Sequence, residues 1–388
     1  MIEKKNILKL ECTACGACVS VCNHKAITFI ENDEGFNYPV IYKELCVNCG
    51  LCEKVCLELI TESSSKSNVK DGYYGWHKDE TVRLGSSSGG VFTGIADEVI
   101  KRGGVVFGAI YDGCSGNVMH VSTRDVDIGL LRKSKYVQSF CGDIFKKVYN
   151  ELMSGYEVLF SGTPCQIAGL KSYLGKDYKN LITCDFLCHG VPAVKLLKDH
   201  LKYLRGKNRH QIKEIDFRPK VRGWSKYDLK IIFENGKVCI RHSENDAFFV
   251  AFLNNLSLRN CCYKCKYSDN NNQSDITIGD FWGYRKYNPG INDEKGLSLV
   301  VVNTEKGKSY LEAVKQLQLY SLDWMFVESV FKKKDNKLYD REKRNQFFSK
   351  YISVGWPGTI KHYKLEWGIY KRMKNFMRNA IKLTLKKI

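Results

Sequence analysis

Short apolar runs alternate with amphipathic stretches through the middle of the chain, and glycine or small polar residues separate them. The apolar runs predict buried strands at 105–110, 158–160 and 181–186. Helical spacing of the apolar positions predicts helices at 91–101, 166–174 and 193–204. Strands that alternate with helices are typical of an α/β domain whose sheet is at least partly parallel.

The pattern changes beyond this region. After about residue 210 the chain becomes richer in strands, which are predicted at 212–217, 229–233, 276–278 and 297–303. From Lys332 onward it is basic and mostly helical in its spacing. No apolar run approaches the roughly 18 residues of a membrane-spanning helix. The 388 residues are therefore expected to form two or three soluble or membrane-peripheral domains.

One cysteine pattern occurs twice near the N-terminus, with the spacing C-x2-C-x2-C-x3-C. The first run is Cys12, Cys15, Cys18 and Cys22, and the second, 34 residues later, is Cys46, Cys49, Cys52 and Cys56. Bacterial two-cluster ferredoxins hold [4Fe–4S] clusters in this way, and the fourth cysteine of each run ligates the other cluster. We therefore predict one cluster on Cys12, Cys15, Cys18 and Cys56, and another on Cys46, Cys49, Cys52 and Cys22.

Two other uses of these cysteines fit less well. Structural zinc sites commonly take separated cysteine pairs, whereas here three cysteines follow one another at steps of three. A disulfide framework needs an oxidising compartment, and the opening MIEKKNILKLEC lacks the apolar region of a signal peptide. A cytoplasmic location is expected instead. Asn23 and Leu57 replace the usual proline after each run, which affects the expected potentials but not the ligands.

A Ser/Gly turn immediately precedes the helix predicted at 91–101. Its residues are Ser86, Ser87, Ser88, Gly89 and Gly90. Small residues let backbone N–H groups approach a phosphate at the N-terminus of a helix. An ordinary turn with a serine cap explains the same residues, so their spacing alone leaves both interpretations open.

Four later cysteines could form a further site. Cys165 and Cys188 each follow a predicted strand, and the loops after parallel strands gather at one edge of a sheet. Cys262 and Cys265 form a C-x2-C pair, with Cys261 as a competitor for the first position. Together the four could hold a third cluster, or they could be separate thiols that pack as small apolar groups.

Most of the net charge of +19 lies near the C-terminus, where residues 332–388 contain 17 Lys and Arg against 4 Asp and Glu. Within 364–388, apolar residues recur at helical spacing with basic residues between them. Such a helix suits an anionic membrane surface. Packing on the protein's own core is the alternative, and nucleic acid is not expected because no recognition fold accompanies the charge.

Seven segments of the chain resemble, in order, the beta-subunit family of coenzyme F-420 hydrogenases and dehydrogenases. These segments are 86–90, 103–106, 134–138, 161–166, 188–190, 262–265 and 275–283. A two-cluster module at the front is also common in that family. The resemblance spans about residues 75–305.

The resemblance implies an FAD-binding α/β domain that carries its own [4Fe–4S] cluster. It implies that Cys165, Cys188, Cys262 and Cys265 ligate this third cluster. It further implies flavin contacts from Ser86, Ser87, Ser88, Gly89 and Gly90, and from Ser134, Lys135 and Tyr136. It assigns no catalytic side chain.

Three domains are predicted from these observations: a two-cluster ferredoxin domain at 1–62, a flavin- and cluster-binding α/β domain at 70–330, and a basic helical tail at 331–388. A Ser- and Lys-rich linker is expected at 62–68. The expected function is that of an iron–sulfur flavoprotein oxidoreductase. It would exchange electrons with a ferredoxin or a larger redox subunit, and reduce or oxidise a small diffusible substrate, which is coenzyme F-420 in the family. The alternatives are a ferredoxin-dependent enzyme of surface-polysaccharide synthesis and a non-catalytic electron-transfer subunit.

Overall fold

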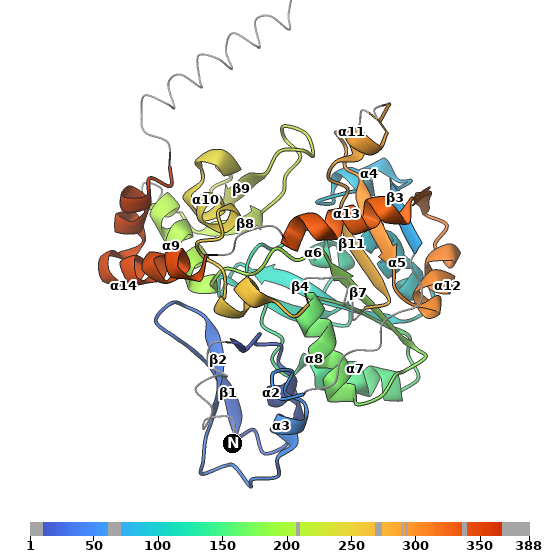
Figure 1. Cartoon of the computed structure of the whole chain (residues 1–388), viewed down its shortest axis with the longest axis horizontal. Helices are drawn as coiled ribbons and strands as arrows, with labels where there is room; N and C mark the ends of the chain where they lie inside the picture. The colour runs from blue at the N-terminus through green and yellow to red at the C-terminus, as the bar shows by residue number, and fades with distance from the viewer. Residues whose placement is uncertain are drawn as a thin grey trace, which may run out of the picture.

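An eight-stranded mixed sheet forms the centre of the molecule (Figure 1). The computed structural model describes residues 11–60, 71–206, 210–267, 274–288, 290–291, 294–335 and 340–366. The strand order in the sheet is β13-β3-β12-β11-β7-β6-β4-β5. The strands are β3 (Asp71–His77), β4 (Val105–Asp112), β5 (Asn117–Ser122), β6 (Val158–Ser161), β7 (Leu181–Phe186), β11 (Ile276–Asp280), β12 (Ser298–Val302) and β13 (Leu317–Leu322).

The middle of this sheet is parallel, and its edges are antiparallel. Strands β4, β6, β7 and β11 pair in parallel, whereas β5, β12, β3 and β13 join in antiparallel fashion. All but the last residue of β7 are buried, because a parallel strand is covered on both faces. The strands predicted at 105–110, 158–160, 181–186, 276–278 and 297–303 are all present to within a few residues, so the predicted α/β class is confirmed.

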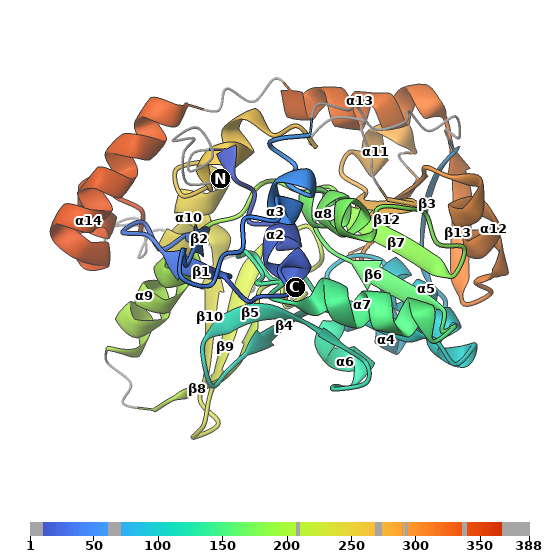
Figure 2. The ribbon, with the colours of Figure 1, turned by 90° about the horizontal axis from the view of Figure 1, so that it is seen from below.

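Helices cover both faces of the sheet (Figure 2). On one face lie α5 (Val91–Lys101) and α12 (Glu305–Ala313), and on the other lie α7 (Ile144–Met153), α8 (Pro164–Leu174) and α13 (Trp324–Asp335). The alternation of side chains along β7 follows from this layering, since Ile182 packs toward α5 and Leu181 toward α8. The helices predicted at 91–101 and 166–174 are confirmed.

A second, all-antiparallel sheet and three helices share another core. The sheet contains β8 (Ile212–Asp216), β9 (Asp228–Phe233) and β10 (Val238–His242), and the helices are α9 (Val194–Arg205), α10 (Ala247–Leu253) and α14 (Arg341–Tyr363). Helix α14 bends at Gly355, whose φ is 68°, just before Pro357. Short helices complete the fold: α4 (Glu80–Leu84), α6 (Ile128–Leu131), α11 (Tyr284–Tyr287), η2 (Ser243–Asn245) and η3 (Asn260–Lys264).

The N-terminal module is small and packs on the α/β domain at two places. It consists of the hairpin β1 (Ile27–Glu31) and β2 (Asn37–Ile41) with the short helices α2 (Ala17–Val21) and α3 (Leu51–Lys54). Ala17 shares a core with α7 and α8. At the other end Phe36 is buried with α9 and α14, and its ring lies 5.6 Å from that of Phe348. The module therefore has a fixed position on the larger domain.

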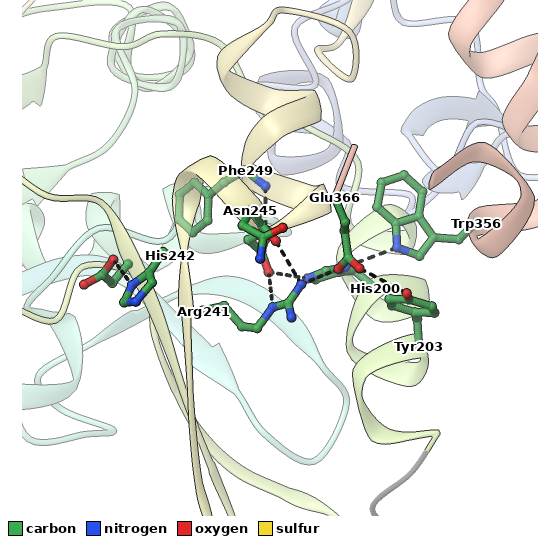
Figure 3. Close-up of polar contacts among 10 residues, drawn as sticks. His200, Tyr203, Arg241, His242, Asn245, Phe249, Trp356 and Glu366 are labelled. Carbon is green, nitrogen blue, oxygen red and sulfur yellow. Dashed lines mark hydrogen bonds and ion pairs between the residues drawn. The ribbon is translucent and has the colours of Figure 1, made fainter. Parts of the chain in front are cut away.

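A buried polar network fastens the last described residues to the core (Figure 3). Trp356 Nε1 donates to His200 Nδ1 at 3.2 Å, so neutral His200 donates from Nε2 to Asp246 at 2.9 Å. Arg241 pairs with both Asp246 and Glu366. The described part of the predicted tail is thus helical, as expected, and α14 packs in the core. Residues 367–388, which include most of the amphipathic stretch, and the linker at 62–68 lie outside the described residues.

Candidate iron–sulfur and flavin sites

The two cysteine runs adopt the same local backbone conformation. Ala14 and Gly16 flank Cys15 with φ values of 53° and 96°, and Asn48 and Gly50 flank Cys49 with 56° and 74°. Each glycine then begins a short helix, α2 or α3. Positive φ is rare for residues with a side chain. Its recurrence at equivalent positions indicates two equivalent ligand loops.

The structure brings the first predicted ligand set together on the inner side of the module. Cys12, Cys15, Cys18 and Cys56 lie close enough to influence one another's pKa values. Burial raises the pKa of the Cys15 thiol to about 12. Cys15 packs on α8, where a Cβ added to Gly169 would lie 2.7 Å from Cys15 Cβ and 2.9 Å from its sulfur.

The second predicted set lies nearer to the surface. Cys46, Cys52 and Cys22 are half-buried around Ile27 and Ile41, whereas Cys49 is exposed. Apolar side chains around the Cys49 loop are exposed too: Leu45, Val47 and Leu51. The two predicted clusters therefore have different surroundings, one facing the α/β domain and the other facing outward.

One cavity gathers the four later cysteines. It is lined by Cys165, Cys188, Cys262 and Cys265, together with Cys261, Thr13, Gln138, His189, Arg259 and Tyr267, among others. Strands β6 and β7 are parallel neighbours, so the loops that carry Cys165 and Cys188 leave the sheet at the same edge. Helix η3 brings Cys262 to the same place. The structure thus places the predicted third ligand set around a single space.

The backbone around this cavity is held in place by local contacts. A capping box between Thr163 and Gln166 starts α8, and Thr163 Oγ1 lies 3.1 Å from the sulfur of Cys165. Gly190 has a φ of 119°, and an added Cβ would lie 3.2 Å from Cys262 Cβ. Among the described residues, no three His, Cys, Asp or Glu side chains converge as ligands of one metal ion. The thiols surround a space, which suits a cluster with one thiolate on each of four irons.

Cys261 lies in the same cavity and remains a competitor of Cys262. A hydrogen bond between the two thiols lowers the pKa of Cys261 and raises that of Cys262. Arg259 further lowers the pKa of Cys261. Which of the two adjacent thiols ligates iron stays a prediction.

The two segments that the resemblance assigns to flavin lie next to each other. The backbone N–H of Ser134 donates to Ser87 Oγ at 2.8 Å. Other groups of the turn are used within the protein, since Ser88 Oγ donates to Leu297 O at 2.7 Å and the N–H of Gly89 donates to Ser298 Oγ at 2.9 Å. A Cβ on Gly89 would lie 2.5 Å from the carbonyl oxygen of Gly75. Packing against β3 and β12 thus requires glycine at position 89, whatever binds there.

Polar groups around these segments fit an anionic ligand. Two buried donors, His77 Nε2 and Arg132 Nε, have no hydrogen-bond partner among the described residues. His77 contacts the turn, because its N–H donates to Gly89 O at 2.8 Å. Burial lowers the pKa of Lys135 to about 7, and the nearby Lys133 lowers it further. The Tyr136 hydroxyl accepts from Arg218 at 2.9 Å.

A single extended segment connects this region with the cysteine cavity. It begins at Ser134, which is bonded to the Ser/Gly turn, and Gln138 and Ser139 further along line the cavity. Gln138 Nε2 donates to Thr13 O at 3.0 Å, next to the first ligand of the front module. The flavin segments, the cavity and the inner front cysteines therefore adjoin one another in that order.

Comparison with known families agrees with this arrangement. Residues 155–323 match the family of coenzyme F420 hydrogenase/dehydrogenase that is described by the C terminus of its beta subunit. The predicted family resemblance is confirmed. This match covers the cavity cysteines Cys165, Cys188, Cys262 and Cys265. Residues 11–58 match the 4Fe-4S dicluster domain, which supports the two clusters predicted for the front module.

Other comparisons add little detail. One solved structure with a similar chain is the xenon derivative of the F420-reducing [NiFe] hydrogenase complex from Methanosarcina barkeri. The alignment has 17% identity and a TM-score of 0.47, and covers 75% of this chain and 95% of the other. No curated protein sequence matches the chain. None of the helices in the described ranges is long and apolar enough to cross a membrane.

Sequence reasoning missed three residues of these sites. Arg259 precedes the C-x2-C pair by three residues, and only that proximity could have singled it out. Gly169 stands inside an otherwise regular helix, which often indicates a close approach by another segment. Gln138 belongs to the matched segment 134–138, but nothing in its type predicts that it joins two domains.

Proposed function

We propose that this protein is an iron–sulfur flavoprotein oxidoreductase. A third [4Fe–4S] cluster on Cys165, Cys188, Cys262 and Cys265 and an FAD near Ser87 and Ser134 complete its set of cofactors. The observation that carries this proposal is the convergence of the four cysteines on one cavity between the front module and the flavin segments. Clusters move single electrons, whereas a flavin exchanges two, so together they couple a one-electron partner to a two-electron reaction.

The burial of the ligand sets supports an order for electron flow. The loop of Cys49 is exposed and ringed by apolar side chains, so it is the entry or exit point for a protein partner. Cys12 and Cys15 face the cavity side, and the flavin segments lie beyond the cavity. The proposed reaction at the far end reduces or oxidises a diffusible substrate of the deazaflavin class, as in the matched family's name.

Flavin binding by the full-length chain tests this proposal directly. We expect anaerobically purified protein to contain FAD or to take up about one FAD per chain. Lys135→Ala should weaken binding at least tenfold, about 1.4 kcal/mol, because the side chain lies among the proposed contacts. Lys78, which donates to Lys315 O on the exposed side of the domain, offers the control Lys78→Ala. A chain that neither contains nor binds FAD would contradict the proposal.

The low pKa of Lys135 predicts a pH dependence of FAD binding. Below pH about 7 the ammonium group is protonated and can attract the pyrophosphate. Above that pH the unliganded chain loses the charge, so affinity should fall by at most tenfold per pH unit. The fall should stop at the higher pKa that Lys135 has beside the bound anion. Titration of FAD between pH 6 and 9 checks this, and Lys135→Ala should remove the slope. An equal slope in both proteins would assign the pH dependence to another group.

A further inference from the structure

A buried arginine lies between the front module and the cysteine cavity. Arg259 has 0% of its surface exposed. Its guanidinium donates to three neutral oxygens: Cys12 O at 2.6 Å, Gln138 Oε1 at 2.9 Å and Asn37 O at 3.0 Å. The ring of Tyr38 lies 4.2 Å away and adds a cation–π contact. None of these partners carries a charge that could neutralise the guanidinium.

This arrangement is unusual for a buried charge. An arginine in a protein interior is normally paired, because an uncompensated charge there is strongly destabilising. Two other buried arginines of this chain follow the rule, since Arg218 pairs with Asp280 and Arg344 with Glu34. The position of Arg259 therefore calls for an anion that its protein partners do not supply.

Thiols of two predicted cluster sites flank the same guanidinium. On one side it holds the carbonyl of Cys12, the first ligand predicted for the inner front cluster. On the other side it lines the cavity, and the N–H of Cys262 donates to the carbonyl oxygen of Arg259 at 3.0 Å. The charge of Arg259 acts on the thiols of Cys12, Cys261 and Cys262. A ligated cluster on either side would supply the missing negative charge.

We propose that Arg259 is a shared counter-charge for the inner front cluster and the cavity cluster. One added electron gives a cluster one more negative charge, and a fixed cation nearby stabilises that reduced state. Arg259 thereby raises the reduction potentials of both clusters and keeps them suited to single-electron exchange. Its three hydrogen bonds also fix the module against the cavity. The cavity half of this inference rests on the proposed third cluster, whereas the front half requires only the two-cluster module.

The test is a potentiometric titration of the full-length protein, monitored by electron paramagnetic resonance. We expect Arg259→Gln to lower the one-electron reduction equilibrium constant of the inner front cluster and of the cavity cluster at least tenfold, about 59 mV each. The outer cluster, on Cys46, Cys49, Cys52 and Cys22, should shift less. Arg259→Lys keeps the charge and should restore most of the potential even if it packs less well.

Arg344→Gln is the matched control. Arg344 is 3% exposed, donates to Leu258 O at 3.1 Å and lies 5.8 Å from the Phe36 ring, so it holds the same module. It approaches the module through Glu34 and Phe36, away from the predicted ligands. Equal shifts in Arg259→Gln and Arg344→Gln, or no shift in either, would overturn the proposal. A chain with only about eight iron atoms would refute the third cluster, while a shift of the inner front cluster would still support the role of Arg259 there.

Discussion

Replacing Cys188 or Cys262 with serine should lower the iron content of the full-length protein from about twelve to about eight atoms per chain. Each residue is a predicted ligand of the cavity cluster, and serine binds the cluster irons far less well than a thiolate does. The front module should keep its two clusters, because its eight ligands lie on other loops. Anaerobic reconstitution followed by iron and sulfide analysis measures the change.

Two further variants make this result specific. Cys184 is buried in β7, four residues before Cys188, and does not line the cavity. Cys184→Ala should therefore leave the iron content unchanged. Cys261→Ser decides between the adjacent thiols: if it removes four irons and Cys262→Ser does not, the ligand is Cys261. If neither Cys188→Ser nor either of these changes the iron content, the cavity holds no cluster.

Periodicity located most of the central sheet, because its strands are short, apolar and separated by glycine or polar turns. The same local logic predicted that Cys165 and Cys188 would meet, since both follow parallel strands. The approach of Cys262 could not be derived in this way. It depends on η3 lying against the Cys188 loop, a contact between segments more than 70 residues apart that only the family resemblance suggested.

The packing of the front module was also beyond sequence reasoning. Phe36 stands in an ordinary hairpin, yet it is buried between α9 and α14. The ion pair of Arg344 with Glu34 joins residues 310 positions apart, and neither residue has a local signal for it. Contacts of this kind depend on how finished elements fit together, whereas sequence patterns report mainly on the elements themselves. The predicted domain boundaries at 1–62, 70–330 and 331–388 rest on those patterns alone.

Gly169→Ala should destabilise the protein, although alanine normally stabilises a helix by about 1 kcal/mol relative to glycine. The new methyl group would lie 2.7 Å from Cys15 Cβ and 2.9 Å from its sulfur, closer than such atoms pack. Cys15 cannot move aside freely when it ligates a cluster. We expect a loss of about 1–3 kcal/mol in the free energy of unfolding, as for other overpacked cores. The iron of the inner front cluster should also be lost more readily, because the module would be pushed away from α8.

The matched control for this substitution is Gly108→Ala in β4. There the added methyl would meet Leu131 atoms at 3.6–3.7 Å, which is ordinary contact, so stability and iron content should change little. Chemical unfolding of both variants, with iron analysis before and after gel filtration, provides the measurement. If Gly169→Ala proved as stable as the parent or more so, Cys15 would not lie against α8. The inner front cluster would then be further from the cavity than proposed, because Gly169 is one helical turn from Cys165.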